Sequence, residues 1–209
     1  MTRSQIIKDI AQDNITVENA LQRLLVISYT LNNPKLQQWI ENELNGYTSD
    51  SIVPDYRKKV TYMIRYTGFN ANNLVKRQPL SESYFSNELQ EVLKTRVIKE
   101  GINIIEDTIK SENEVSFNLI DCAGIISNNS GGMIRCIRLE QVISKTTFLR
   151  ILSSVKTKLI QLLLDLEREF GSLENLDIDT SNKSEDELNK VNDEIAKRVY
   201  FDGRSEEVF

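Results

Sequence analysis

The feature that most constrains this chain is a long amphipathic segment at residues 145–170. Its apolar residues recur at the spacing that places them on one face of an α-helix. They are Phe148, Ile151, Leu152, Val155, Leu159, Leu162, Leu163, Leu166 and Phe170. Ser144 can cap the start of this helix and Gly171 can end it. Such a helix is about 39 Å long. We expect it to be the spine of the domain, with dimerisation as the alternative use of its apolar stripe.

The first 46 residues predict three shorter amphipathic helices. The first covers about residues 2–13, and the second follows Thr16 as its N-cap. The third follows Asn33, with Pro34 in its first turn, and Gly46 would stop it. Because the connections between them are short, we expect the three helices to pack as one N-terminal subdomain.

The middle of the chain predicts strands. Residues 60–66 alternate β-branched or aromatic side chains with other residues, the pattern of a half-buried strand. Residues 115–120 and 133–139 predict two more strands, and a returning segment can start near Leu74. The fold class is therefore α+β and mostly helical, with the three-helix subdomain, a small antiparallel or mixed sheet and the long C-terminal spine helix.

Two details of this middle region depend on weaker signals. A helix capped by Ser86 carries apolar residues as far as Ile98. Gly101 can interrupt it, and Ile102, Ile105 and Ile109 can continue the pattern. The polar residues 127–132 read as a loop or hairpin turn, and they lack the downstream Gly-Lys-Ser/Thr of a phosphate-binding loop.

The charge distribution predicts a boundary at residue 170. Residues 171–209 hold five Lys/Arg and eleven Asp/Glu, whereas residues 1–170 are close to neutral. Ser184 and Glu187 have the spacing of a capping box before a last helix. We therefore expect an α+β domain at 1–170 and, at 171–209, an acidic linker with an amphipathic helix. That helix would dock on this chain's own basic helix face or on a partner chain.

The composition excludes several chemistries. The chain has no histidine, which excludes Ser-His-Asp and Cys-His nucleophiles and histidine-ligated zinc. Its two cysteines, Cys122 and Cys136, suit a reducing compartment and read as small core residues. No apolar run reaches the ~20 residues that span a bilayer, and residues 1–5 lack the apolar stretch of a signal peptide. We expect a cytoplasmic protein with no cofactor and no membrane span.

Two groups of charged residues are candidates for binding. Glu41, Glu43, Asp50 and Asp55 cluster in sequence and can be read as cation ligands or as solvated surface acids, but they match no calcium loop. Pro54-Asp55 could begin a restriction-type nuclease motif, yet the acid-x-Lys half that should follow is missing. We predict no metal site and no catalytic residues here. A basic patch at Lys145, Arg150 and Lys158 could bind phosphate or an acidic partner, or could be a solvated face.

One segment resembles a known family. Residues 36–47 read LQQWIENELNGY and residues 53–57 read VPDYR. This resembles the AbiTii family of bacterial abortive-infection proteins, in which a helix ending in Trp-x-x-x-Glu-Leu-x-Gly-Tyr precedes a loop with Pro-x-Tyr-Arg. The resemblance covers about residues 4–170. It implies a bacterial protein linked to phage defence, and it implies no particular reaction.

The motif itself admits two interpretations. In the structural one, Trp39 is buried, the tyrosines pack with hydrogen-bonded tips, and Arg57 pairs with Glu43 or Asp55. In the functional one, Trp39, Glu43, Asp55, Tyr56 and Arg57 form a recognition surface. We expect a non-enzymatic interaction, sensor or toxin/antitoxin-type component of a defence system. It would bind a protein partner or itself, with nucleic acid as a further possibility. The alternative is a metal-dependent nuclease or nucleotide-processing enzyme that uses carboxylates.

Overall fold

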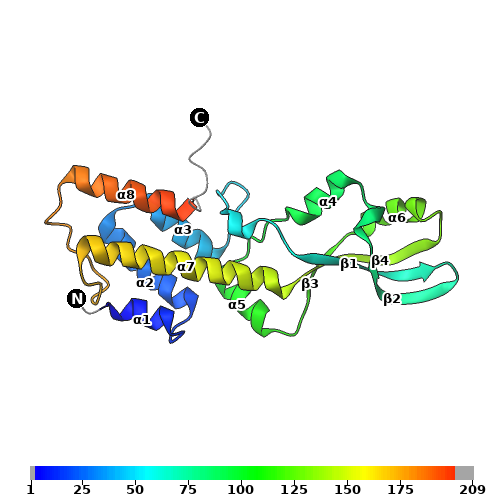
Figure 1. Cartoon of the computed structure of the whole chain (residues 1–209), viewed down its shortest axis with the longest axis horizontal. Coiled ribbons are helices and arrows are strands. Elements are labelled where there is room, and N and C mark those ends of the chain that lie inside the picture. Colours follow the sequence, from blue (N-terminus) through cyan, green and yellow to red (C-terminus); the bar gives the residue numbers. More distant parts are fainter. Residues whose placement is uncertain (1–2, 201–209) are drawn as a thin grey trace. The chain divides into compact units, whose positions relative to one another are not determined.

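The computed structural model describes residues 3–200, which form helices and one antiparallel sheet (Figure 1). The α-helices are α1 Gln5–Ala11, α2 Val17–Leu31, α3 Pro34–Asn45, α4 Asn87–Lys94, α5 Ile102–Lys110, α6 Ala123–Asn129, α7 Lys145–Phe170 and α8 Glu185–Tyr200. The strands are β1 Tyr62–Asn70, β2 Asn73–Leu80, β3 Val115–Asn118 and β4 Ile134–Ile143. Three short 3-10 helices are η1 Asp55–Arg57, η2 Glu82–Tyr84 and η3 Ile120–Cys122. The predicted α+β, mostly helical class is confirmed.

The chain divides into two compact units, each built from separate stretches of sequence. The helical unit comprises Met1–Arg57, Lys99–Asp107 and Arg150–Phe209, and the sheet unit comprises Lys58–Ile98 and Thr108–Leu149. This division does not follow the boundary expected at residue 170. Beyond that residue, Leu173, Ile178, Ile195, Ala196 and Val199 are all buried, so cutting there would expose apolar surface. A separable tail at 171–209 remains a prediction.

Local side-chain bonds fix the starts of the predicted helices. The Thr16 hydroxyl accepts a hydrogen bond from the Asn19 amide at 3.1 Å, and the Asn33 side chain accepts one from the Leu36 amide at 3.0 Å. Each bond satisfies a backbone donor that has no partner inside its helix. The capping box before α8 is also present, since the Ser184 amide donates to the Glu187 carboxylate at 2.8 Å. Thr2, where the first helix was expected to begin, lies outside the described residues.

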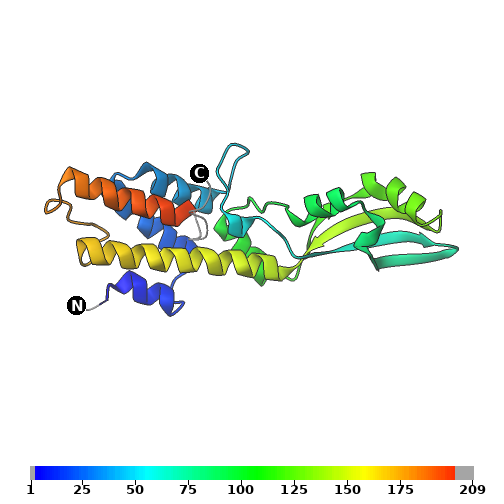
Figure 2. The ribbon, with the colours of Figure 1, turned by 45° about the horizontal axis from the view of Figure 1, so that its top comes forward.

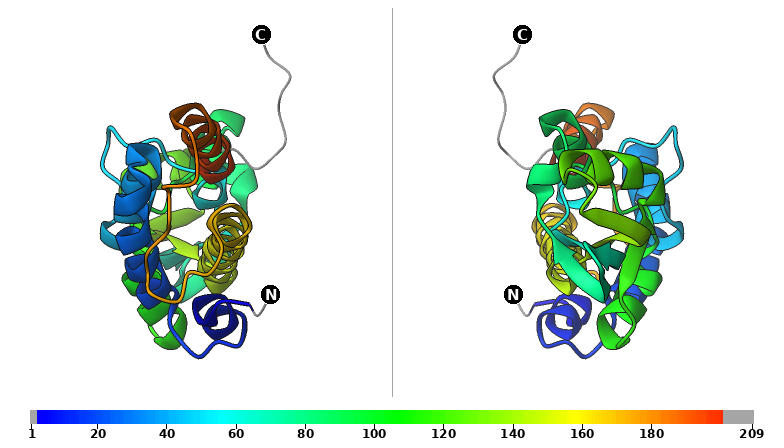
Figure 3. Two further views of the ribbon diagram at one scale, coloured as in Figure 1. Left: turned by 90° about the vertical axis from the view of Figure 1, so that its left-hand side faces the viewer. Right: turned by 90° about the vertical axis from the view of Figure 1, so that its right-hand side faces the viewer.

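The helical unit is built around α7. In Figures 2 and 3, α7 (yellow) lies between α1 and α8. Its apolar stripe is buried within the chain, with Ile151, Val155, Leu159, Leu162, Leu163 and Leu166 all fully buried. Ser4, before α1, donates from its amide and its hydroxyl to the Glu167 carboxylate of α7 at 2.6 Å. Core packing, the expected use of the stripe, is therefore the observed one.

The sheet unit is a four-stranded antiparallel sheet in the order β2-β1-β4-β3. Its core lies on one face, where α4 and α6 pack on the sheet (Figure 1). Buried side chains there include Ile64, Tyr66, Leu93, Ile126 and Leu139. The free cysteines Cys122 and Cys136 pack against this core and are partly buried. Among the described residues, α4 and α6 are the α-helices that lie wholly within this unit, and neither packs on the opposite face of the sheet.

Two expectations for the middle region are wrong in part. The helix after Ser86 ends at Lys94 and does not reach Ile98, whereas the interruption expected at Gly101 is present and a separate helix begins at Ile102. Between the two helices the chain passes close to the end of α3. A Cβ on Gly101 would lie 2.4 Å from the Leu44 carbonyl oxygen, and one on Gly46 2.8 Å from the Lys99 carbonyl oxygen. This approach of two backbones requires glycine on both sides. The predicted loop at 127–132 instead begins inside α6.

Candidate functional site

The side chains of the Trp-to-Arg motif meet inside the helical unit. Trp39 and Glu43 lie on α3, one turn apart, and Tyr56 and Arg57 lie on η1. Trp39, Glu43 and Arg57 are fully buried, and Tyr56 is 7% exposed. Gly46 ends α3 with a positive φ of 94°, which directs Tyr47 back toward the same place. The structure thus brings four of the five predicted binding residues, together with Tyr47, into one buried cluster.

Glu43 is the centre of this cluster. Its Oε1 accepts hydrogen bonds from the Tyr47 hydroxyl at 2.5 Å, the Tyr56 hydroxyl at 2.7 Å and Arg57 Nε at 3.1 Å. Its Oε2 accepts from Arg57 Nη2 at 2.5 Å. The two-pronged bond between guanidinium and carboxylate is the strong form of this pair. We call these five residues, Trp39, Glu43, Tyr47, Tyr56 and Arg57, the Glu43 network.

The remaining polar groups of the Glu43 network are also satisfied. Trp39 Nε1 donates to the Tyr56 hydroxyl at 3.0 Å, and Arg57 Nη1 donates to the Glu100 carbonyl oxygen at 2.7 Å. The Arg57 guanidinium lies over the Tyr47 ring, 4.8 Å from its centre. Burial of a charged pair is costly unless its hydrogen bonds are completed, and here they are. The network therefore ties α3, η1 and the segment before α5 together.

The local electrostatics keep the donors protonated. Burial raises the pKa of the Tyr47 and Tyr56 hydroxyls, and the adjacent Glu43 carboxylate raises both further. Burial by itself would lower the pKa of Arg57, but the Glu43 carboxylate outweighs it, so the pKa of Arg57 is raised. Glu43 Oε1 is occupied by three donors. Its Oε2 accepts from Arg57 Nη2, so both carboxylate oxygens are bonded to side chains of this chain.

Asp55 stands apart from this cluster. It is the first residue of η1 and its side chain is exposed, whereas the cluster is buried. Arg57 pairs with Glu43, one of the two partners that the sequence allowed. Glu41 and Asp50 are exposed as well. Within residues 3–200, no three acidic or cysteine side chains lie close enough together to hold a metal ion. The role of the five predicted residues in binding remains a prediction.

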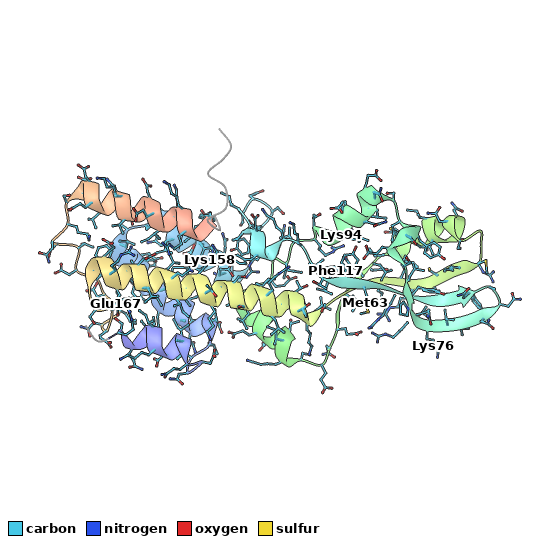
Figure 4. All side chains as sticks on the ribbon, viewed as in Figure 1. Met63, Lys76, Lys94, Phe117, Lys158 and Glu167 are labelled. Carbon is cyan, nitrogen blue, oxygen red and sulfur yellow. The ribbon has the colours of Figure 1, made fainter. Side chains whose placement is uncertain are left out.

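The three predicted basic residues of α7 have different surroundings. Lys145 donates through Nζ to the Ser111 carbonyl oxygen at 2.5 Å, and Arg150 is exposed. Lys158 is 7% exposed and donates to the Arg198 carbonyl oxygen of α8 at 2.9 Å (Figure 4). Its ammonium also lies 5.7 Å from the centre of the Tyr56 ring. Lys158 therefore joins α8 to the edge of the Glu43 network, and it adds no charge to an exposed patch.

Two partners in this region were not among the predicted site residues. Tyr47 was expected to pack with a hydrogen-bonded tip, and its spacing of four residues from Glu43 could have indicated the contact. The Glu100 carbonyl comes from a distant part of the chain, and no local signal points to it. Lys158 was predicted as part of a basic patch, and its position beside the Tyr56 ring was not foreseen. Among the described helices, none is both long and apolar enough to cross a membrane.

Comparison with known proteins identifies the family. Neither the curated proteins nor the solved structures gave a match to this chain. A family model described as AbiTii matches residues 3–192. The match extends through the Glu43 network, the sheet unit, α7 and part of α8. The chain therefore belongs to the AbiTii family, a family of abortive-infection phage-defence proteins.

Proposed function

We propose that this chain is a non-enzymatic interaction component of an abortive-infection system, acting as a sensor or as a toxin- or antitoxin-type partner. The observation that supports this is the state of the motif that first suggested the family. Its carboxylate, tyrosines and guanidinium are buried and bonded to one another. They stabilise the helical unit, which leaves the exposed surfaces of the chain to make contact with partners.

The expected partner is a protein or a second copy of the chain, and the expected location is the cytoplasm. Both cysteines are free and pack at the edge of the sheet core, which suits a reducing compartment. Capture of the tagged protein before and after phage challenge, followed by identification of bound proteins and nucleic acids, would name the partner. A partner whose binding changes on infection would support the sensor form of the proposal.

The defence role is tested in a phage-sensitive bacterial host. Cells that produce the protein should plate a panel of phages less efficiently than control cells. Infected cells should be lost before they release phage, which is the outcome that defines abortive infection. Unchanged plating and unchanged phage release across a broad panel, with the folded protein present, would count against the role.

The alternative is a metal-dependent nuclease or nucleotide-processing enzyme, and Asp55 is the exposed acid on which it would depend. Purified protein should not turn over labelled DNA, RNA or nucleoside triphosphates with Mg²⁺ or Mn²⁺. Asp55→Ala should keep phage protection, as should the matched control Asp50→Ala. Metal-dependent turnover that is lost in Asp55→Ala and kept in Asp50→Ala would overturn the non-enzymatic proposal.

A further inference from the structure

The face of the sheet opposite α4 and α6 carries four arginines. Strand alternation places Arg65 on the face opposite Ile64 and Tyr66. On the neighbouring strand β4, Arg138 lies opposite Thr67 and Arg135 opposite Phe69, farther along the same face. Arg77 of β2 reaches the same carboxylate as Arg65, that of Glu114. Met63 lies on this face and is 46% exposed. In Figure 4 it lies on the side of the sheet away from α4, the helix that carries Lys94. We call Arg65, Arg77, Arg135 and Arg138 the arginine face.

The positive charge of the sheet unit is not apparent from the composition of the whole chain. The full sequence has a net charge of −5. The sheet unit nevertheless contains 11 Lys/Arg and 7 Asp/Glu, whereas the rest of the chain contains 15 and 24. The two units therefore have opposite signs, and a polyanion would be attracted to the sheet unit and repelled by the helical one.

Two carboxylates partly neutralise the arginine face. Glu114 pairs with Arg65 at 2.7 Å and with Arg77, and Glu140 pairs with Arg138 at 2.7 Å. In these pairs the side chains of Arg77 and Arg138 are 59% and 67% exposed, respectively. Such exposed pairs are weak and screened by salt, so a polyanion can compete for the same guanidinium groups. Four cations against two carboxylates leave a net positive surface.

Groups that can bind bases lie among the arginines. The Arg135 guanidinium lies over the Phe69 ring of β1, 5.3 Å from its centre. Beside them is a hollow of about 400 Å³ lined by Ser116, Asn118, Ile120, Ile137, Arg138 and Glu140. Its walls offer apolar surface together with hydroxyl, amide and carboxylate groups. Aromatic and guanidinium planes stack on unpaired bases, and such polar groups can bond to exposed base edges.

We propose that the arginine face binds single-stranded nucleic acid. The phosphates would lie along the arginines, one base would stack at Phe69 and Arg135, and another would enter the hollow. An acidic protein segment would match the charge but would make no use of the stacking pair or of the polar hollow. The inference goes beyond the proposed function, which expects a protein partner or a second copy of the chain, because it adds a nucleic-acid ligand at a defined surface.

The test is fluorescence anisotropy with purified full-length protein and labelled single strands of oligothymidine and oligouridine. The wild type should bind, and its affinity should fall between about 50 mM and about 200 mM salt because phosphate contacts release counterions. Arg135→Ala combined with Arg138→Ala should weaken binding about tenfold or more and lower the salt slope by about 2. Phe69→Leu should weaken binding without changing that slope.

Lys94→Ala is the matched control. Lys94 is a cation of the same unit with a side chain that is 44% exposed, and it is also paired with a glutamate. It lies on α4, which packs on the other face. It should change affinity by less than about twofold, and thermal unfolding should show that every variant is folded. The inference is overturned if the wild type does not bind, if Lys94→Ala is as harmful as Arg138→Ala, or if polyglutamate displaces the strand as well as unlabelled oligonucleotide does. None of these results would decide the defence role, which the phage-plating experiment tests separately.

Discussion

The two units of this chain place their charged residues in opposite ways. In the helical unit, the most concentrated polar chemistry is inside, where Glu43 and Arg57 are both fully buried. In the sheet unit it is outside, where the ion pairs of the arginine face remain partly exposed. Buried pairs are costly to break, whereas exposed pairs contribute little to stability and stay open to exchange. The comparison favours a structural role for the family motif, and under the proposed function contact with partners falls to the exposed surface.

The largest effect is expected from Glu43→Ala. This change leaves Arg57 and two tyrosine hydroxyls buried without their acceptor, and loss of one member of a buried pair costs about 3–5 kcal/mol. Glu41→Ala, an exposed site on the same helix, is the control and should change stability by less than about 0.5 kcal/mol. Thermal or urea unfolding measures both. Similar small effects of the two substitutions would mean that Glu43 is not structural.

Trp39→Ala should be similarly damaging, because loss of a buried tryptophan costs about 3–5 kcal/mol. Trp39→Phe keeps an aromatic ring but removes the donor to the Tyr56 hydroxyl, so it should cost less, about 1–3 kcal/mol. An unfolding midpoint unchanged in Trp39→Ala would show that the side chain is exposed in solution. That result would support the interpretation of the motif as a recognition surface.

Alkaline pH should weaken the helical unit through Tyr47 and Tyr56. Unfolded tyrosines ionise near pH 10, whereas both buried hydroxyls have raised pKa values and keep their protons. The unfolded state therefore loses protons first, and stability falls as pH rises above about 10, by about 1.4 kcal/mol per pH unit for each tyrosine. Tyr47→Phe should make this decline shallower. A slope identical to that of the wild type would contradict the assignment.

The smallest effect on stability is expected on the arginine face. Arg65→Ala removes an ion pair whose Glu114 partner is 43% exposed, so the free energy of unfolding should change by about 0–1 kcal/mol. The measurement is urea unfolding beside Glu43→Ala. A loss as large as that of Glu43→Ala would mean that both units depend on their ion pairs, and the contrast between them would disappear.

Much of the fold follows from local chemistry in the sequence. Thr16, Asn33 and Ser86 mark helix starts because each accepts a bond from an amide three residues ahead. The stripe of α7 gives both ends of that helix correctly. Gly101 marked a possible break, but the end of α4 at Lys94 could not be predicted, because the path to Gly101 depends on contact with the backbone at Leu44. α6 was missed because its Ser- and Asn-rich end resembles a loop.

The arrangement of the two sites could be predicted from the sequence less completely than the fold. The motif allowed two possible partners for Arg57, and only the folded path of η1 against α3 brings the Glu43 carboxylate to it. Burial could not be read from the motif, since the same residue types suit a recognition surface. The arginine face draws on three strands, and its residues meet only once the strand order is known. Counting charge along the chain hides it, because each unit consists of separated segments.

The central claim is that Glu43 and Arg57 act as one buried structural unit, and a double-mutant cycle tests it most directly. Glu43→Leu and Arg57→Met should each cost about 3–5 kcal/mol, because each leaves one buried charge without its partner. The double variant removes both charges, so its cost should fall below the sum of the singles by about 2–3 kcal/mol. Costs that add to within about 0.5 kcal/mol would show that the two residues act independently, and that result would contradict this account.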